Sequence, residues 1–101
     1  MKLSDPWFDL VKSGKKKVEI RLYDEKRRKL NIGDKILFND DFKKKIKDLK
    51  VFNTFEDALR SSKLKNSLPG VRTYKEGIDI YHSIGDYKKG EKKYKVLAIY
   101  L

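Results

Sequence analysis

Apolar and polar residues alternate with a period of two in three short stretches of the chain. In residues 18–22 the apolar positions alternate with Glu19 and Arg21. We expect a strand with one buried face, and the two charges then share the opposite face, about two strand rises or ~7 Å apart. Residues 35–38 follow a Gly-Asp turn, and residues 94–101 alternate to the end of the chain. Both stretches are predicted to be strands.

Apolar residues that recur every three to four positions predict three helices. The first is expected to begin at Pro6, with Asp5 as its cap, and to end at Gly14. The second follows Thr54, which precedes two acidic residues in the first helical turn. The third covers residues 73–85, where a Thr and a Glu three residues later form a capping-box pattern.

The remaining segments carry weaker signals. Residues 42–52 fit a helical spacing in one part and a strand spacing in another, so periodicity alone does not decide between them. Residues 61–72 are polar and contain a Pro-Gly pair, and residues 88–93 are almost entirely basic. We predict loops for both of these segments.

Length and composition limit the classes of protein. With 101 residues we expect one domain, residues 1–101, that buries roughly 60–65% of its unfolded surface. Cysteine is absent and there is one histidine, so we expect no disulfide, no metal site and no cofactor. No apolar run is long enough to cross a membrane and no signal-peptide pattern is present, so we expect a cytoplasmic protein without membrane contact. A monomer is the favoured state.

The net charge of +11 predicts an anionic partner. Such a field attracts polyanions and speeds their encounter, and nucleic acid is the obvious candidate. Lysine greatly outnumbers arginine. This weakens the case for bidentate phosphate recognition, because that geometry favours arginine. The lysine-rich segments 26–29, 43–50 and 88–93 are expected to be solvated faces first and phosphate contacts second. An acidic protein partner is the alternative reading of the same charge.

The most informative chemistry lies in the spacing G-x-K-x-x-E-x-R, formed by Gly14, Lys16, Glu19 and Arg21. If the three charged side chains converge, the two cations can hold a phosphate or carbonyl oxygen. Positive charge on both sides favours the ionised form of a carboxylate, so Glu19 would act as a hydrogen-bond acceptor or general base. The plainer interpretation is an exposed ladder of ion pairs on a strand, which contributes little to stability.

With this motif, the sequence resembles the ASCH domain family, a branch of the PUA-like barrels. Residues 30–38 are similar to the family's x-x-G-D-x-I-x-F strand entry, and residues 94–101 to its closing strand. The resemblance implies an α+β fold, a small PUA-like mixed β-barrel with about three flanking helices. It also implies that residues 42–52 form strand rather than helix.

The resemblance implies two possible enzymatic activities. Some small ASCH-like proteins hydrolyse the amide of acetylcytidine with a lysine, a threonine and a glutamate. Lys16 fills the lysine position here, but the threonine position holds Glu19 and the glutamate position falls near Gly70 or Val71. Other ASCH proteins cleave RNA through a lysine with tyrosine and serine partners, for which several side chains are available: Tyr23, Tyr81 and Ser83.

For the aromatic residues and the single histidine, both a functional and a structural role can be considered. Tyr23 and Tyr87 lie near turns and charged segments, and we expect them to stack on bases. Trp7, Tyr74 and Tyr81 occupy helical stripe positions, so we assign them to the core. His82 is either a general base for RNA cleavage or a solvated residue near a helix end, and the second is the commoner situation.

These observations favour a domain that binds RNA, or a modified base or nucleotide, in a cleft lined by lysine, glutamate and arginine. The residues expected to contact the nucleic acid are Lys16, Lys17, Glu19, Arg21, Tyr23 and Tyr87. The alternative is a hydrolase acting on RNA or a nucleoside, with Lys16 and Glu19 as its catalytic residues.

Overall fold

The computed structural model describes all 101 residues and shows an α+β fold with five strands and five α-helices. The elements follow the chain as α1 (Trp7–Lys12), β1 (Val18–Leu22), the short 3-10 helix η1 (Arg27–Lys29), β2 (Lys35–Phe38), β3 (Phe42–Lys45), β4 (Asp48–Phe52), α2 (Phe55–Ser62), α3 (Leu64–Ser67), α4 (Tyr74–His82), α5 (Tyr87–Tyr94) and β5 (Val96–Tyr100).

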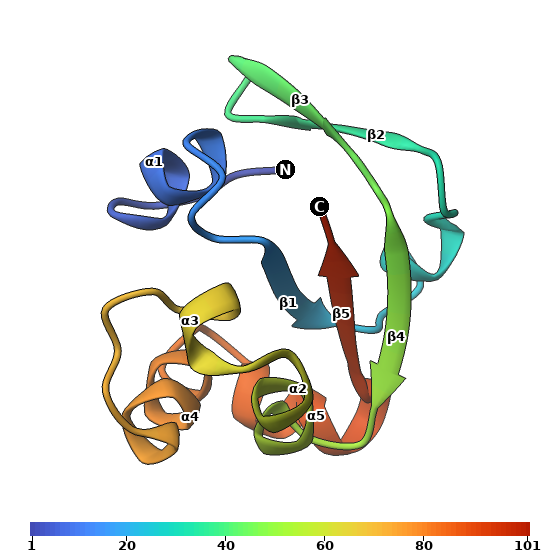
Figure 1. The fold of residues 1–101 in the computed structure, drawn as a ribbon. Helices are drawn as coiled ribbons and strands as arrows, with labels where there is room; N and C mark the ends of the chain where they lie inside the picture. Colours follow the sequence, from blue (N-terminus) through green and yellow to red (C-terminus); the bar gives the residue numbers. More distant parts are fainter.

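The strands form two separate antiparallel sheets. β5 lies in the centre of a three-stranded sheet, between β1 and β4, and β2 pairs only with β3. Figure 1 shows the β2–β3 hairpin bent over one end of the three-stranded sheet. No ladder joins the hairpin to that sheet, so the expected closed barrel is not confirmed.

The helices α2 to α5 gather at the end of the sheet opposite the hairpin (Figure 1). They bury a core of aliphatic and aromatic side chains against β1 and β5. α5 lies very close to β1. Gly90 is the only buried residue of α5, and a Cβ at this position would be 2.5 Å from Leu22 Cδ1 of β1. A second, smaller core lies beneath the hairpin and contacts α1.

The strand and helix predictions are mostly confirmed. Residues 42–52 form β3 and β4, as the family resemblance implied. Thr54 caps α2 by accepting a hydrogen bond from Asp57 N at 3.0 Å. Thr73 caps α4 in the same way, accepting from Glu76 N at 3.1 Å. The cap at Thr73 was predicted from the sequence, whereas Thr54 was expected only to precede its helix; both threonines cap in the structure.

Three local predictions are wrong. Residues 88–93 are part of the helix α5, and α3 interrupts the predicted loop 61–72, so five helices flank the sheets instead of three. α5 was missed because its inward face consists of Tyr87, Gly90 and Tyr94, which give almost no aliphatic periodicity. At α1, Pro6 occupies the cap position, and no side chain caps the helix. None of the helices is long and apolar enough to cross a membrane.

Candidate functional site

Strand β1 is covered on both faces, which places charged residues in the interior. Val18 and Ile20 face the helical core, and Glu19, on the other face, is only 4% exposed. The N-terminal segment covers this second face, since Arg21 Nη2 donates a hydrogen bond of 2.7 Å to the carbonyl of Lys2. The interpretation of these charges as an exposed ladder of ion pairs is therefore wrong.

Lys16 is a buried lysine, 2% exposed, just before β1. Its ammonium donates to the carbonyl of Val18 at 2.8 Å and to the carbonyl of Ser67, and it lies 3.3 Å from Glu19 Oε1. A lysine ammonium has three N–H groups, so this geometry uses all of them. Burial lowers the pKa of Lys16, although the neighbouring Glu19 carboxylate acts in the opposite direction.

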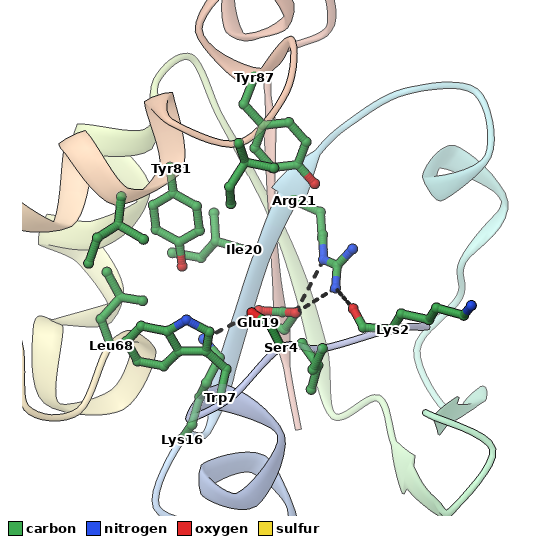
Figure 2. Close-up of a pocket in the computed structure, with 13 residues that line it drawn as sticks. Lys2, Ser4, Trp7, Lys16, Glu19, Ile20, Arg21, Leu68, Tyr81 and Tyr87 are labelled. Atoms are coloured by element: carbon green, nitrogen blue, oxygen red, sulfur yellow. Dashed lines mark hydrogen bonds and ion pairs between the residues drawn. The ribbon is translucent and has the colours of Figure 1, made fainter.

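Glu19 is held between two cations, as Figure 2 shows. Its Oε2 accepts hydrogen bonds from Arg21 Nε at 3.2 Å and from Arg21 Nη2 at 3.0 Å. The side chain of Tyr87 also interacts with this guanidinium. Burial acts to lower the pKa of Arg21, but the Glu19 carboxylate and Tyr87 outweigh it, and the pKa is raised. The guanidinium therefore stays charged beside the carboxylate.

These charges lie in the wall of a cavity of about 450 Å³, within the size range of small-ligand pockets. Most of the other lining residues are apolar or aromatic. The full lining is Lys2, Leu3, Ser4, Trp7, Lys16, Glu19, Ile20, Arg21, Leu68, Ile80, Tyr81, Ile84 and Tyr87. The pocket thus combines a small number of fixed polar groups with an apolar wall.

One polar atom in this wall has no partner. The hydroxyl of Tyr81 is buried and makes no hydrogen bond, and Figure 2 shows it pointing into the space beside Glu19 and Trp7. Burial, with a contribution from the Glu19 carboxylate, raises the pKa of Tyr81 well above its usual value. An unpaired buried hydroxyl is unfavourable, so this position suits a ligand group that completes the hydrogen bond.

The family of the chain follows from its full-length match to the ASCH domain, over residues 1–101. The chain belongs to the ASCH domain family. At a coarse level, membership of this family suggests an RNA-binding function.

Two solved structures are very similar to this ASCH domain. The crystal structure of hypothetical protein PH0355 has a TM-score of 0.93 and 42% identity, covering 99% of this chain and 93% of that chain. The solution NMR structure of protein PF0455 from Pyrococcus furiosus has a TM-score of 0.83 and 44% identity, covering 99% of this chain and 91% of that chain. The names of these relatives state no ligand or activity. No curated protein matches the chain.

The fold brings together four of the six residues selected from the sequence of the ASCH domain. Lys16, Glu19, Arg21 and Tyr87 all line the pocket. The other two do not. The ring of Tyr23 packs with the core beneath the hairpin and is covered by the Arg28 guanidinium, 4.8 Å from its centroid. Lys17 is exposed in a second hollow.

Two pocket residues, Trp7 and Tyr81, were expected in the core, although Tyr81 was also considered as a partner for RNA cleavage. Tyr81 is indeed buried, with its ring stacked on Phe55 at a centroid distance of 4.8 Å, but its hydroxyl faces the pocket. Trp7 is half-buried, and the Lys16 ammonium lies 5.8 Å from its ring centroid. Helical periodicity indicates only that such a residue faces inward, so nothing in the sequence pattern distinguished a core face from a pocket wall.

His82 lies outside the pocket and has a structural partner. Its Nε2 is 3.3 Å from both carboxylate oxygens of Glu91, and Glu91 Oε2 accepts a 2.7 Å hydrogen bond from Phe55 N. The histidine is therefore neither isolated nor fully solvated; it links α4, α5 and the start of α2. No group of three or more His, Cys, Asp or Glu side chains that could hold a metal ion occurs in the domain.

Proposed function

We propose that this ASCH domain binds RNA, or a modified base or nucleotide, in the pocket formed by Lys16, Glu19 and Arg21. The observation that carries the proposal is the buried carboxylate held between two cations in the wall of a ligand-sized cavity. Buried ion pairs contribute little to stability, because the loss of hydration offsets their attraction. Perturbed charged groups that converge on a pocket are typical of functional sites.

The geometry assigns a different part to each charged residue. Lys16 uses its three donors within the protein, so it orients Glu19 rather than contacting the ligand. Glu19 Oε2 already accepts two hydrogen bonds, whereas Oε1 has one nearby donor and can accept another. Arg21 Nη1 is not engaged by Glu19 or Lys2 and can donate to a ligand. The pocket therefore offers an acceptor beside a donor, which matches the polar edge of a nucleobase.

Aromatic side chains complete this environment. Trp7 and Tyr87 line the pocket with the charged residues, and rings in such positions can stack on a base. The unpaired hydroxyl of Tyr81 adds a donor or acceptor deep in the wall. A base that satisfies Tyr81 and Glu19 together would be distinguished from one that satisfies only one of them, because an unpaired buried group is costly.

The direct test is a titration of the isotopically labelled protein with a short single-stranded RNA and with single nucleosides, at near-physiological salt. We expect the largest amide shifts at residues 16–21 and at Tyr81 and Tyr87. Arg21→Gln is expected to weaken binding about 10-fold, the usual effect of losing a hydrogen bond to a charged group. The matched control is Arg28→Gln, which removes an exposed arginine outside the pocket. Equal effects of the two variants would contradict the proposal.

The hydrolase alternative rests on the lowered pKa of Lys16 beside Glu19, a pairing that also suits proton transfer. Product formation from acetylcytidine or an RNA oligomer would test it. Turnover that disappears in Glu19→Gln would favour the enzyme. Binding of the same compounds without turnover would favour the binding domain.

A further inference from the structure

A second hollow, of about 300 Å³, adjoins the pocket. Lys16 lines both cavities, so the two are separated by this one side chain and its surroundings. The new hollow is basic where the first is mostly apolar. Four further lysines line it, and we call them the lysine groove: Lys17, Lys44, Lys45 and Lys47.

The cations of the lysine groove have no acidic partners. The domain contains five ion pairs between Lys or Arg and an acidic side chain, besides the His82–Glu91 contact, and none of them involves a groove lysine. The pairing of β2 with β3 also places Lys45 directly opposite Lys35. Like charges opposite each other destabilise a sheet, so this pair of lysines lowers the stability of the hairpin. An anion bound beside Lys45 would reduce this repulsion, although Lys35 itself does not line the hollow.

We propose that the lysine groove binds the phosphodiester backbone of the RNA whose base enters the pocket. This inference rests on the proposed function, since it extends the same nucleic acid from one cavity to the next. Lysine ammoniums are flexible point charges that suit phosphates without requiring a fixed orientation. Contacts of this kind position the strand and carry no sequence information, while Glu19 and Tyr81 read the base. The shared Lys16 places the two functions side by side.

The test compares two variants that lose the same charge. In the groove variant Lys17, Lys44, Lys45 and Lys47 are changed to Gln, and in the control variant the same change is made at four exposed lysines of α5: Lys88, Lys89, Lys92 and Lys93. Figure 1 shows that α5 and the hairpin lie at opposite ends of the domain. The measured quantity is the slope of log K against log salt concentration for a single-stranded RNA oligomer.

Each phosphate contact to a single strand contributes about 0.7 to this slope. We expect the groove variant to lose about 2 to 3 units of slope, and the control variant less than about 1, because none of the four α5 lysines lines either cavity. Equal slopes in the two variants would overturn the inference.

A measurement on the unaltered protein separates this inference from the proposed function. A nucleoside without phosphate is expected to shift amides around the pocket only, and the RNA oligomer to shift those of the lysine groove as well. Absence of groove shifts with the oligomer would overturn the groove inference even if the nucleoside binds. Groove shifts caused by an oligoglutamate peptide but not by RNA would also overturn it, and would assign the groove to an acidic protein. A nucleoside that fails to bind, while the RNA oligomer still shifts the lysine groove, contradicts the pocket proposal but supports phosphate binding in the groove.

Discussion

The pocket and the lysine groove use the same kind of residue in opposite environments. Lys16 and Lys17 are adjacent in the chain, yet Lys16 is 2% exposed and bound by three acceptors, whereas Lys17 is exposed and without an acidic partner. In the pocket one carboxylate offsets one of its two neighbouring cations, and all three groups hold fixed positions. In the groove the positive charges lie near one another without an acidic partner. The comparison teaches that a count of lysines describes attraction for anions, whereas burial and hydrogen bonding decide where recognition takes place.

The strongest test of this contrast is truncation of the two adjacent lysines. Lys16→Ala is expected to lower the free energy of unfolding by about 3 to 5 kcal/mol, because it removes one partner of a buried ion pair and leaves carbonyls without a donor. Lys17→Ala is expected to change it by less than about 0.5 kcal/mol, as for other exposed positions. Urea unfolding of both variants measures the difference. Similar values for the two would mean that Lys16 is not held as the structure shows.

The same lysine gives the stability a pH dependence. The pKa of Lys16 is lowered in the folded protein, so the unfolded chain binds more protons in the interval below its ordinary value of 10.5. Stability then rises with pH through this interval. We expect the difference in unfolding free energy between wild type and Lys16→Met to increase as the pH is raised towards 10.5. A difference independent of pH would contradict the lowered pKa.

A smaller effect is expected for the carboxylate at the centre of the pocket. Glu19→Gln should weaken binding of a pocket ligand by about 30-fold, or about 2 kcal/mol, because it removes a charged acceptor. Glu56→Gln is the matched control, since Glu56 is exposed and pairs only with Arg60. Calorimetric titration with the nucleoside that binds wild type measures both. A Glu19→Gln variant that binds with unchanged affinity would remove the carboxylate from the site.

Removal of the unpaired hydroxyl should move stability and binding in opposite directions. Tyr81→Phe is expected to raise the free energy of unfolding by about 1 kcal/mol, because a buried polar group without a partner disappears. Ligand affinity is expected to fall at the same time. Parallel loss of both would indicate that the hydroxyl has a partner within the folded domain.

The smallest effect is expected in the hairpin. Lys45→Gln should raise stability by a few tenths of a kcal/mol at low salt, because it relieves the repulsion with Lys35 opposite. The gain should disappear near 1 M salt, where such charges are screened. A gain that persists at high salt would show that packing, and not charge, is responsible.

Local chemistry determined much of this protein from the sequence alone. The period-two pattern placed β1, β2 and the final strand, the acidic first turn after Thr54 indicated α2, and the Thr73 capping box indicated α4. The motif spacing also selected Lys16, Glu19 and Arg21 before any geometry was known, because a strand places alternate residues on one face. Each of these signals depends on residues close together in the chain.

Tertiary structure alone decided the rest. Whether the charged face of β1 meets water or protein depends on the N-terminal segment and on the carbonyl of Ser67, which is far away in the sequence. The helix α5 carries too few aliphatic residues to be recognised, yet it packs against β1 through a glycine. Tyr81 became a pocket residue only because its helix ends beside Glu19. Long-range packing sets burial, and burial turns a common set of charges into a candidate site.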